Sequence, residues 1–322
     1  MNRALPYKTK QFFFVLIKLS IVVGAFYFIY NKLVTNSELN FDDFIDFLTK
    51  NDNFSFQNIL FLLFLSFFNW FLEILKWQYL VSSIKKISFF EALKQSLGSL
   101  TASLFTPNRI GDYGAKALYY KSGFRKRIVL LNFLGNMMQM SITVCFGIIG
   151  LYYFITEYQV DFNVHRVSRF FIIIVIITLL SIFGIKQKKY KIKGFYIDKV
   201  IDFVKQLPSK IILSGTALSL LRYFVFSFQF YYLLLIFDVE VVYFQAMILI
   251  TSMYLLTSIV PSIFIFDVVI KGSVAVYLFS KIGVNEFTIL SIVLLMWILN
   301  FIIPSLIGSF YVLTFKLPKP KS

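Results

Sequence analysis

The sequence predicts an all-α membrane protein, a bundle of helices that crosses a bilayer several times. Of its 322 residues 58% are hydrophobic and only 15% are charged, whereas a soluble domain carries about 25% charged residues. Several apolar runs approach the ~20 residues that a helix needs to cross the hydrocarbon core. The segments between them are alternately rich in basic and in acidic residues, as expected for a polytopic protein.

Six apolar runs are expected to be full spans. They cover residues 12–30, 59–81, 128–155, 170–185, 211–237 and 287–313. Basic residues precede the first run, form the loop at 186–210 and follow the last run. Because cytoplasmic loops carry the excess of Lys and Arg, we expect both termini in the cytoplasm, and we expect a bacterial plasma membrane. Within the basic loop, 197–206 could form a short amphipathic helix at the interface or simply be solvated.

Two further apolar regions are each broken in the middle. Residues 90–105 and 111–123 are too short to span comfortably, and Pro107, Arg109 and Gly111 lie at the break. Proline removes a backbone donor and disfavours helix in the residue before it, and glycine permits a sharp turn. We therefore expect two half-helices that enter the membrane and return. A second run stops at Pro261 and resumes at Asp267.

The two breaks have similar spacing. Pro107-x4-Asp112-x3-Lys116 matches Pro261-x5-Asp267-x3-Lys271 to within one residue. The charge pattern gives the two broken pairs opposite orientations, which indicates an inverted repeat like those of many transporters. One domain, 1–322, would then contain repeat one at about 57–155, the basic cytoplasmic loop at 186–210 and repeat two at about 211–313. Two unrelated proline-broken segments are the alternative.

Charged residues within the apolar runs are the candidate substrate-binding residues. They are Glu73, Lys76, Arg109, Asp112, Lys116, Arg222, Asp267 and Lys271. Intramembrane charges are costly and usually face a cavity or a partner. A cation near a half-helix start suits a phosphate, and arginine offers a bidentate fork. We expect a groove between the two broken pairs that accepts an anionic lipid headgroup. Alternatively, Asp112–Lys116, Asp267–Lys271 and Glu73–Lys76 only neutralise one another.

The sequence gives little support for a catalytic function. The chain has one cysteine, Cys145, and one histidine, His165, and it lacks DxD and HExxH motifs. We expect no catalytic residues, no metal and no cofactor. The net charge of +16 fits basic cytoplasmic loops rather than nucleic-acid binding. A non-catalytic subunit of an envelope lipid or glycan pathway and an intramembrane lipid-linked transferase are the alternative functions.

Short motifs resemble the membrane region of lysylphosphatidylglycerol synthases, which also occurs alone in flippase-like proteins. The motifs are Lys76-Trp77, Phe90-Glu91-Ala92, the stretch from Thr106 to Asp112, Arg222, Pro261 and Gly283-Val284. The resemblance covers about residues 10–315 and implies a helical bundle with paired re-entrant helices and a lipid-translocating or lipid-binding role. The sequence departs from the family at 262–267, which is usually glycine-rich and followed by glutamate. Asn136 and Asn300 stand in spans where the family often has arginine. No aminoacyl-transferase domain follows, so that activity is not expected.

Overall fold

The computed structural model describes residues 54–104, 106, 110–158, 191–192, 195–259 and 267–316, with five further positions between 16 and 27. Within these ranges, four helical segments are long and apolar enough to cross a membrane. They are α3 (Phe56–Val81), α6 (Ser122–Glu157), α9 (Ser209–Ile236) and the segment Glu286–Thr314. These confirm the spans predicted at 59–81, 128–155, 211–237 and 287–313. The spans predicted at 12–30, apart from the five positions, and at 170–185 lie outside the described residues.

Shorter helices occupy the positions of the predicted half-helices. They are α4 (Phe89–Ser103), α5 (Ile110–Leu118), α10 (Tyr243–Ile259) and α11 (Asp267–Ser280). Ser88 and Glu91 form a reciprocal capping box at the start of α4, which satisfies two otherwise orphaned backbone donors. The prediction that the second half-helix continues to residue 123 was wrong. It ends at Leu118, because the chain turns through Tyr119 and Tyr120 before α6 begins.

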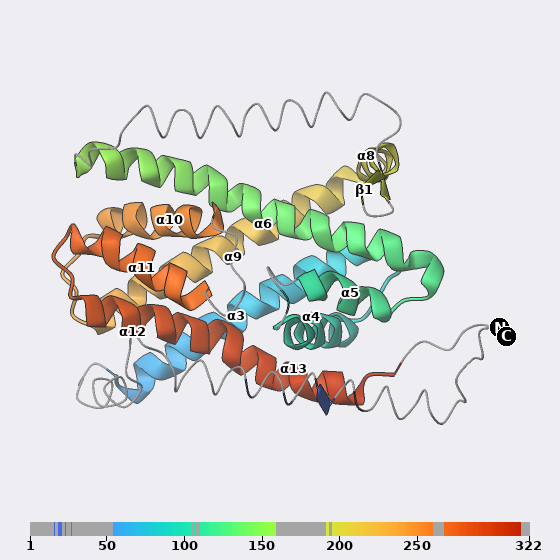
Figure 1. Cartoon of the computed structure of the whole chain (residues 1–322), viewed down its shortest axis with the longest axis horizontal. Coiled ribbons are helices and arrows are strands. Elements are labelled where there is room, and N and C mark those ends of the chain that lie inside the picture. The colour runs from blue at the N-terminus through green and yellow to red at the C-terminus, as the bar shows by residue number, and fades with distance from the viewer. Residues whose placement is uncertain are drawn as a thin grey trace.

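The long helices pack in pairs with the short ones. Helix α3 packs along α9 in the middle of the bundle, α4 packs against α13 (Ile303–Thr314), and α10 packs against α6 (Figure 1). The α4–α5 pair lies at one end of the bundle, where α3 ends and α6 begins. The α10–α11 pair lies at the opposite end, where α9 ends and α12 (Glu286–Trp297) begins (Figure 1). Each pair therefore returns to the end from which it started, as a re-entrant pair does.

Two of these helix crossings depend on glycine. A Cβ at Gly308 of α13 would lie 2.2 Å from the Leu97 carbonyl oxygen of α4, and a Cβ at Gly150 of α6 would lie 2.0 Å from the Thr251 hydroxyl of α10. Small residues allow helix backbones to approach closely in membranes. The hydroxyl of Thr101 also donates to the Ser305 carbonyl across the first crossing, at 2.8 Å.

The last long segment is not a continuous α-helix. A five-residue π-helix, η3 (Ile298–Ile302), joins α12 to α13. The irregular turn lies just before Pro304. Pro304 has no N–H to give to the carbonyl four residues earlier, so the regular ladder is interrupted there.

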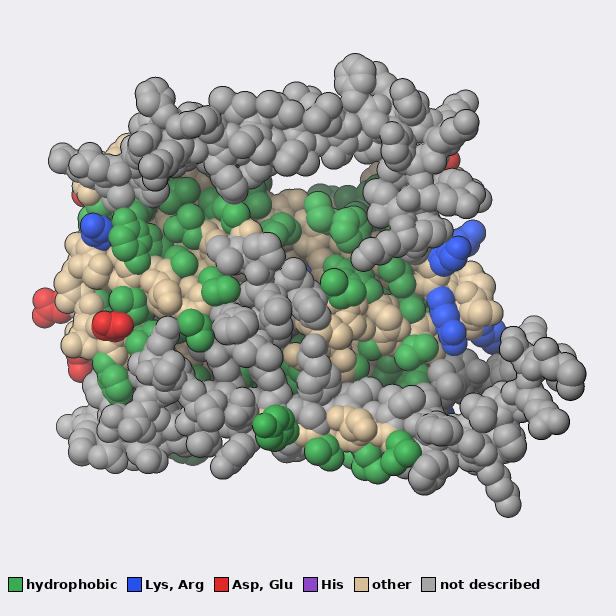
Figure 2. Space-filling model, viewed as in Figure 1, with side chains coloured by type: hydrophobic (Ala, Val, Ile, Leu, Met, Phe, Trp, Pro, Cys, Tyr) green, Lys and Arg blue, Asp and Glu red, His purple; other side chains and the backbone are tan. Residues whose placement is uncertain are grey.

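The two ends of the bundle differ in charge. Exposed Lys and Arg side chains gather where α3 ends and α6 begins, whereas exposed acids gather at the opposite end (Figure 2). The basic group includes Lys85, Lys86, Lys121, Lys126 and Arg127, and the acidic group includes Glu157, Asp238, Glu240 and Glu286. Between the ends the visible side chains are mainly hydrophobic, which suits a bundle surrounded by lipid.

Part of the basic loop is folded. A two-residue antiparallel hairpin, β1 (Lys191–Ile192) and β2 (Phe195–Tyr196), precedes α8 (Ile197–Lys205). Of the two alternatives for 197–206, the structure shows the helix, at Ile197–Lys205. Phe203 and Leu207 pack on the hydrophobic cluster around Trp77, so the end of α8 is attached to the basic end of the bundle.

Candidate functional site

A polar cavity of about 290 Å³ lies within the bundle, in contact with α3, α4, α5, α6 and α9. Its charged lining residues are Glu73, Asp112, Lys116 and Arg222. The other lining residues are Trp70, Ser96, Leu100, Ser103, Tyr113 and Asn136. Four charged side chains in one cavity of so apolar a chain mark it as the candidate functional site.

The first half of the site joins α3 to α9. Glu73 accepts a hydrogen bond from Arg222 Nη1 at 2.7 Å, and Lys76 Nζ lies 2.7 Å from the same carboxylate oxygen. Arg222 Nε donates to Asn69 Oδ1 at 3.0 Å. Asn69 and Glu73 are one helical turn apart on α3, so together they fix the plane of the guanidinium group. The Arg222 side chain remains 23% exposed, which leaves part of it open to the cavity.

The second half of the site joins α5 to α4 and α6. Lys116 and Asp112 lie one turn apart on α5, with Nζ 3.4 Å from Oδ2. Asn132 of α6 holds both of them, because its Oδ1 accepts from Lys116 at 2.9 Å and its Nδ2 donates to Asp112. Ser99 of α4 donates to the other oxygen of Asp112. The Asp112 carboxylate is thus held from three helices.

Lys116 also contacts an aromatic ring, which is itself held by a hydrogen bond. The ammonium lies 4.6 Å from the centre of the Trp77 ring, a favourable cation–π distance. Trp77 Nε1 and the Tyr120 hydroxyl both donate to Gln95 Oε1 at 2.8 Å. Burial raises the pKa of Tyr120, which lies in the turn between α5 and α6, to about 12. Its hydroxyl therefore stays protonated and remains a donor at physiological pH.

The structure brings together five of the eight predicted site residues: Glu73, Lys76, Asp112, Lys116 and Arg222. Lys76 does not line the cavity, however. It is only 2% exposed and pairs with Glu73, so it compensates the carboxylate charge. Arg109 and the side chain of Asp267 lie outside the described residues.

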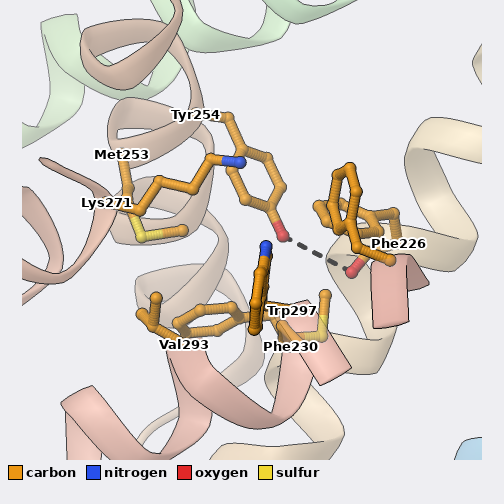
Figure 3. Close-up of a pocket in the computed structure, with 9 residues that line it drawn as sticks. Phe226, Phe230, Met253, Tyr254, Lys271, Val293 and Trp297 are labelled. Atoms are coloured by element: carbon orange, nitrogen blue, oxygen red, sulfur yellow. Dashed lines mark hydrogen bonds between the residues drawn. The ribbon is translucent and has the colours of Figure 1, made fainter. Parts of the chain in front are cut away.

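Lys271 lies in a different pocket. This pocket has a volume of about 30 Å³, room for about one water molecule, and its lining is almost entirely apolar. Figure 3 shows Lys271 among Met253, Tyr254 and Trp297, where the Tyr254 hydroxyl donates to a backbone carbonyl of α9. The lysine ammonium is also 5.6 Å from the centre of the Phe301 ring. Lys271 is therefore no part of the charged cavity.

The groove predicted between the two broken pairs stays a prediction, because both proline breaks lie outside the described residues. Among the described residues, the charged cavity is lined by the first pair and by the spans α3, α6 and α9. Helix α3 packs along α9 through the centre of the bundle, and the pocket that contains Lys271 is lined by α9, α10, α11 and the last span.

Sequence reasoning missed the serines of α4. Ser96, Ser99 and Ser103 line or support the cavity. Their spacing of three and four residues places them on one helical face, and a polar stripe on a membrane helix is the signal that could have found them. Asn132 and Asn136 lie one turn apart on α6, and both bond to the α5 helix.

No group of three or more His, Cys, Asp or Glu side chains that could hold a metal ion occurs in the described part of the chain. The cavity instead combines hydrogen-bond donors, two carboxylates and two cations. Such a set can bind a polar group by charge and hydrogen bonding.

The fold and the cavity together define a polytopic helical membrane protein with a charged site inside its bundle. Residues 15–308 match the family model described as the lysylphosphatidylglycerol synthase TM region. This match covers most of the chain, so the protein belongs to that family, as its motifs predicted. Searches of curated proteins and of solved structures gave no match.

Proposed function

We propose that this protein is a flippase-like translocator or binder of a phosphate-bearing anionic lipid, and that the headgroup enters the charged cavity. The observation that carries the proposal is Arg222, an arginine held inside an apolar bundle with part of its side chain open to a cavity of about 290 Å³. An intramembrane charge kept at such cost is a functional feature by default. Membership of the lysylphosphatidylglycerol synthase TM family supports a lipid ligand.

The charge balance favours an anion. The cluster contains three cations, Lys76, Lys116 and Arg222, and two carboxylates, Glu73 and Asp112. One positive charge therefore remains when all five groups are ionised. A phosphodiester would complete the neutralisation, and its oxygens suit the planar donor set of a guanidinium.

The Arg222 hydrogen bonds leave a donor for such a ligand. Nε and Nη1 are used by Asn69 and Glu73, while Nη2 makes no hydrogen bond with the described residues. Tyr113 and the serines Ser96 and Ser103 supply neutral polar groups on the other side of the cavity. These groups can hold a headgroup by hydrogen bonds without adding charge.

The proposed setting is a bacterial plasma membrane, with both termini in the cytoplasm. The positive-inside rule assigns the cytoplasmic side to the end that carries Lys85, Lys86 and Arg127 (Figure 2). The α4–α5 pair would then enter from the cytoplasm and the α10–α11 pair from outside. The repeat boundaries near 57–155 and 211–313 belong to the same proposal, because both units use the same element order with opposite direction.

A reconstitution experiment tests this function. Purified protein in liposomes that contain a fluorescent phosphatidylglycerol should make the inner-leaflet label accessible to dithionite. Arg222→Gln should slow this transfer about 10- to 100-fold, which corresponds to one charged hydrogen bond of about 1.5–3 kcal/mol. Lys210→Gln is the matched control, since it removes an exposed cation from the same helix, and it should transfer lipid at the wild-type rate.

The other outcomes separate the alternatives. Equal transfer by wild type and Arg222→Gln would refute the cavity as the site. Binding of the lipid without transfer would favour a non-translocating subunit of an envelope pathway. Chemical change of the lipid, visible by mass spectrometry, would favour an intramembrane transferase. Neither an enzymatic activity nor a cofactor is part of our proposal.

A further inference from the structure

A chain of buried amides connects Arg222 to the π-helical turn of the last span. Asn69 uses its Oδ1 to accept from Arg222, and its Nδ2 donates to Asn300 Oδ1 at 2.8 Å. Asn300 Nδ2 donates in turn to Gln229 Oε1 at 2.9 Å, and Gln229 Nε2 donates to Ser66 Oγ at 2.7 Å. Asn69, Asn300, Gln229 and Ser66 are all buried.

Every amide in this chain has its orientation fixed. Gln229 Nε2 also donates to the Leu62 carbonyl at 3.1 Å, and a carbonyl can only accept. Gln229 must therefore present its oxygen to Asn300, Asn300 must present its oxygen to Asn69, and Asn69 must present its oxygen to Arg222. If one amide flipped, two buried donors or two buried acceptors would face each other, which is costly in a low-dielectric interior.

The π-helical turn places Asn300 where it can make these bonds. In a regular α-helix the Asn300 carbonyl would accept from residue 304, but that residue is Pro304, which has no N–H. The indole Nε1 of Trp70 donates to this carbonyl instead, at 2.9 Å. Two consecutive residues of α3, Asn69 and Trp70, thus bind the side chain and the backbone of Asn300. Single π-helical turns frequently occur at functional sites.

We propose that Asn300 is a positioning residue for Arg222: from the last span and through Asn69, it fixes the guanidinium orientation that the cavity presents to its ligand. Asn300 does not line the cavity, so it acts on the ligand only through other residues. The inference rests on the proposed function for its effect on lipid, but its effect on Arg222 can be measured without any lipid substrate. Because Asn300 belongs to the last span, this role also makes the position of that span relative to α3 a determinant of headgroup affinity.

The direct test observes the Arg222 guanidinium itself. In ¹⁵N-labelled protein in micelles, the Arg222 Nε–H resonance can be assigned by its absence in Arg222→Gln. In the wild type this proton should exchange slowly with water, because it is buried against Asn69. Asn300→Leu removes the acceptor of Asn69 Nδ2 and allows that amide to flip, so we expect proton exchange at least tenfold faster. Asn300→Ala removes the same amide without adding bulk if the leucine variant does not fold.

Ser291→Ala is the matched control. Ser291 is fully buried in the same span, and its hydroxyl has no hydrogen-bond partner among the described residues. This variant should leave the Arg222 proton unchanged. In the liposome assay, Asn300→Leu should raise the lipid fraction needed for half-maximal transfer at least tenfold and change the maximal rate by less than twofold.

Different results would overturn the positioning role of Asn300 and the proposed lipid function. Unchanged exchange of the Arg222 proton in folded Asn300→Leu or Asn300→Ala protein would overturn the positioning role, whatever the transport result. A loss of maximal rate with unchanged half-saturation would also overturn it, because a merely structural defect gives that pattern. Absence of both lipid transfer and lipid binding by the wild type, together with the expected change in proton exchange, would overturn the proposed function and leave the positioning of Arg222 intact.

Discussion

Glu73 is the residue whose removal should disturb the site most. Its Oε2 atom lies 2.7 Å from both Lys76 and Arg222. At that distance, with an effective dielectric constant of 20, each contact is worth roughly 6 kcal/mol before the cost of desolvation is subtracted. The net effect of breaking a buried pair is smaller, about 3–5 kcal/mol, because it includes the penalty of leaving a charge unpaired.

The two cations should not contribute equally to this loss. The Arg222 side chain is 23% exposed, whereas that of Lys76 is 3% exposed. Water in the cavity can solvate Arg222 after the carboxylate is gone, but it cannot reach Lys76. We therefore expect Glu73→Gln to lower the free energy of unfolding by about 3–5 kcal/mol, mostly through Lys76. The double variant Glu73→Gln/Lys76→Met should regain at least half of the lost stability.

Denaturant titration in detergent micelles measures both changes, with tryptophan fluorescence as the signal. Trp70 and Trp77 lie within one turn of Glu73 on the same helix, so their emission reports on this region. A loss below about 1 kcal/mol for Glu73→Gln would show that the ion pairs add little stability. A double variant no more stable than Glu73→Gln would refute the assignment of the cost to Lys76. Lys210→Gln, which removes an exposed cation, should leave the stability unchanged.

Two further predictions concern the scaffold. Gly308→Ala should not fold into a species that elutes as one monodisperse peak in size-exclusion chromatography, since its Cβ would clash with the Leu97 carbonyl oxygen. Gly114→Ala is the control: its Cβ would meet nothing within 4 Å, so this variant should elute as the wild type does. The burial that raises the pKa of Tyr120 to about 12 favours its neutral form in the folded state. Its contribution to stability is thus complete below pH 10 and is lost as the pH rises to 12. Tyr120→Phe should therefore flatten the fall in unfolding free energy measured over that range, and an unchanged fall would contradict this assignment.

The sequence predicted the long helices well because their signals are local. Apolar length, flanking charge and proline breaks are all visible within 30 residues, and four spans and the first half-helix were predicted near their observed bounds, whereas the second half-helix is shorter than predicted. The π-helical turn was not predicted, although Pro304 marked the place. The first and fourth predicted spans and the two proline breaks lie outside the described residues, so they stay predictions.

The site was predicted less completely because its pairs are distant in sequence. Lys76–Glu73 and Lys116–Asp112 are local, and helical spacing predicted both. Arg222 and Glu73 are 149 residues apart, so only the packing of α9 on α3 shows that they are partners. Lys271 was predicted as a site residue from its spacing, and the structure places it in a different pocket. Its spacing from the proline matches that of Lys116, but spacing within a repeat does not determine which helices line a cavity.

The paired charges of the cavity are compatible with ligand binding. Each of the two partly buried carboxylates is held by at least one cation, which reduces the cost of placing charges inside a membrane protein. If every cation were equally enclosed, the cluster would be purely structural. The exposures differ, however: Lys76 does not line the cavity, Lys116 lines it with a side chain only 4% exposed, and the Arg222 side chain is 23% exposed. The excess positive charge of the cluster is thus accessible at one residue, and the amide chain from Gln229 through Asn300 holds that residue in place. On the proposed function, an arriving phosphate meets a cation whose orientation is already fixed, so little of its binding energy is lost in ordering the site.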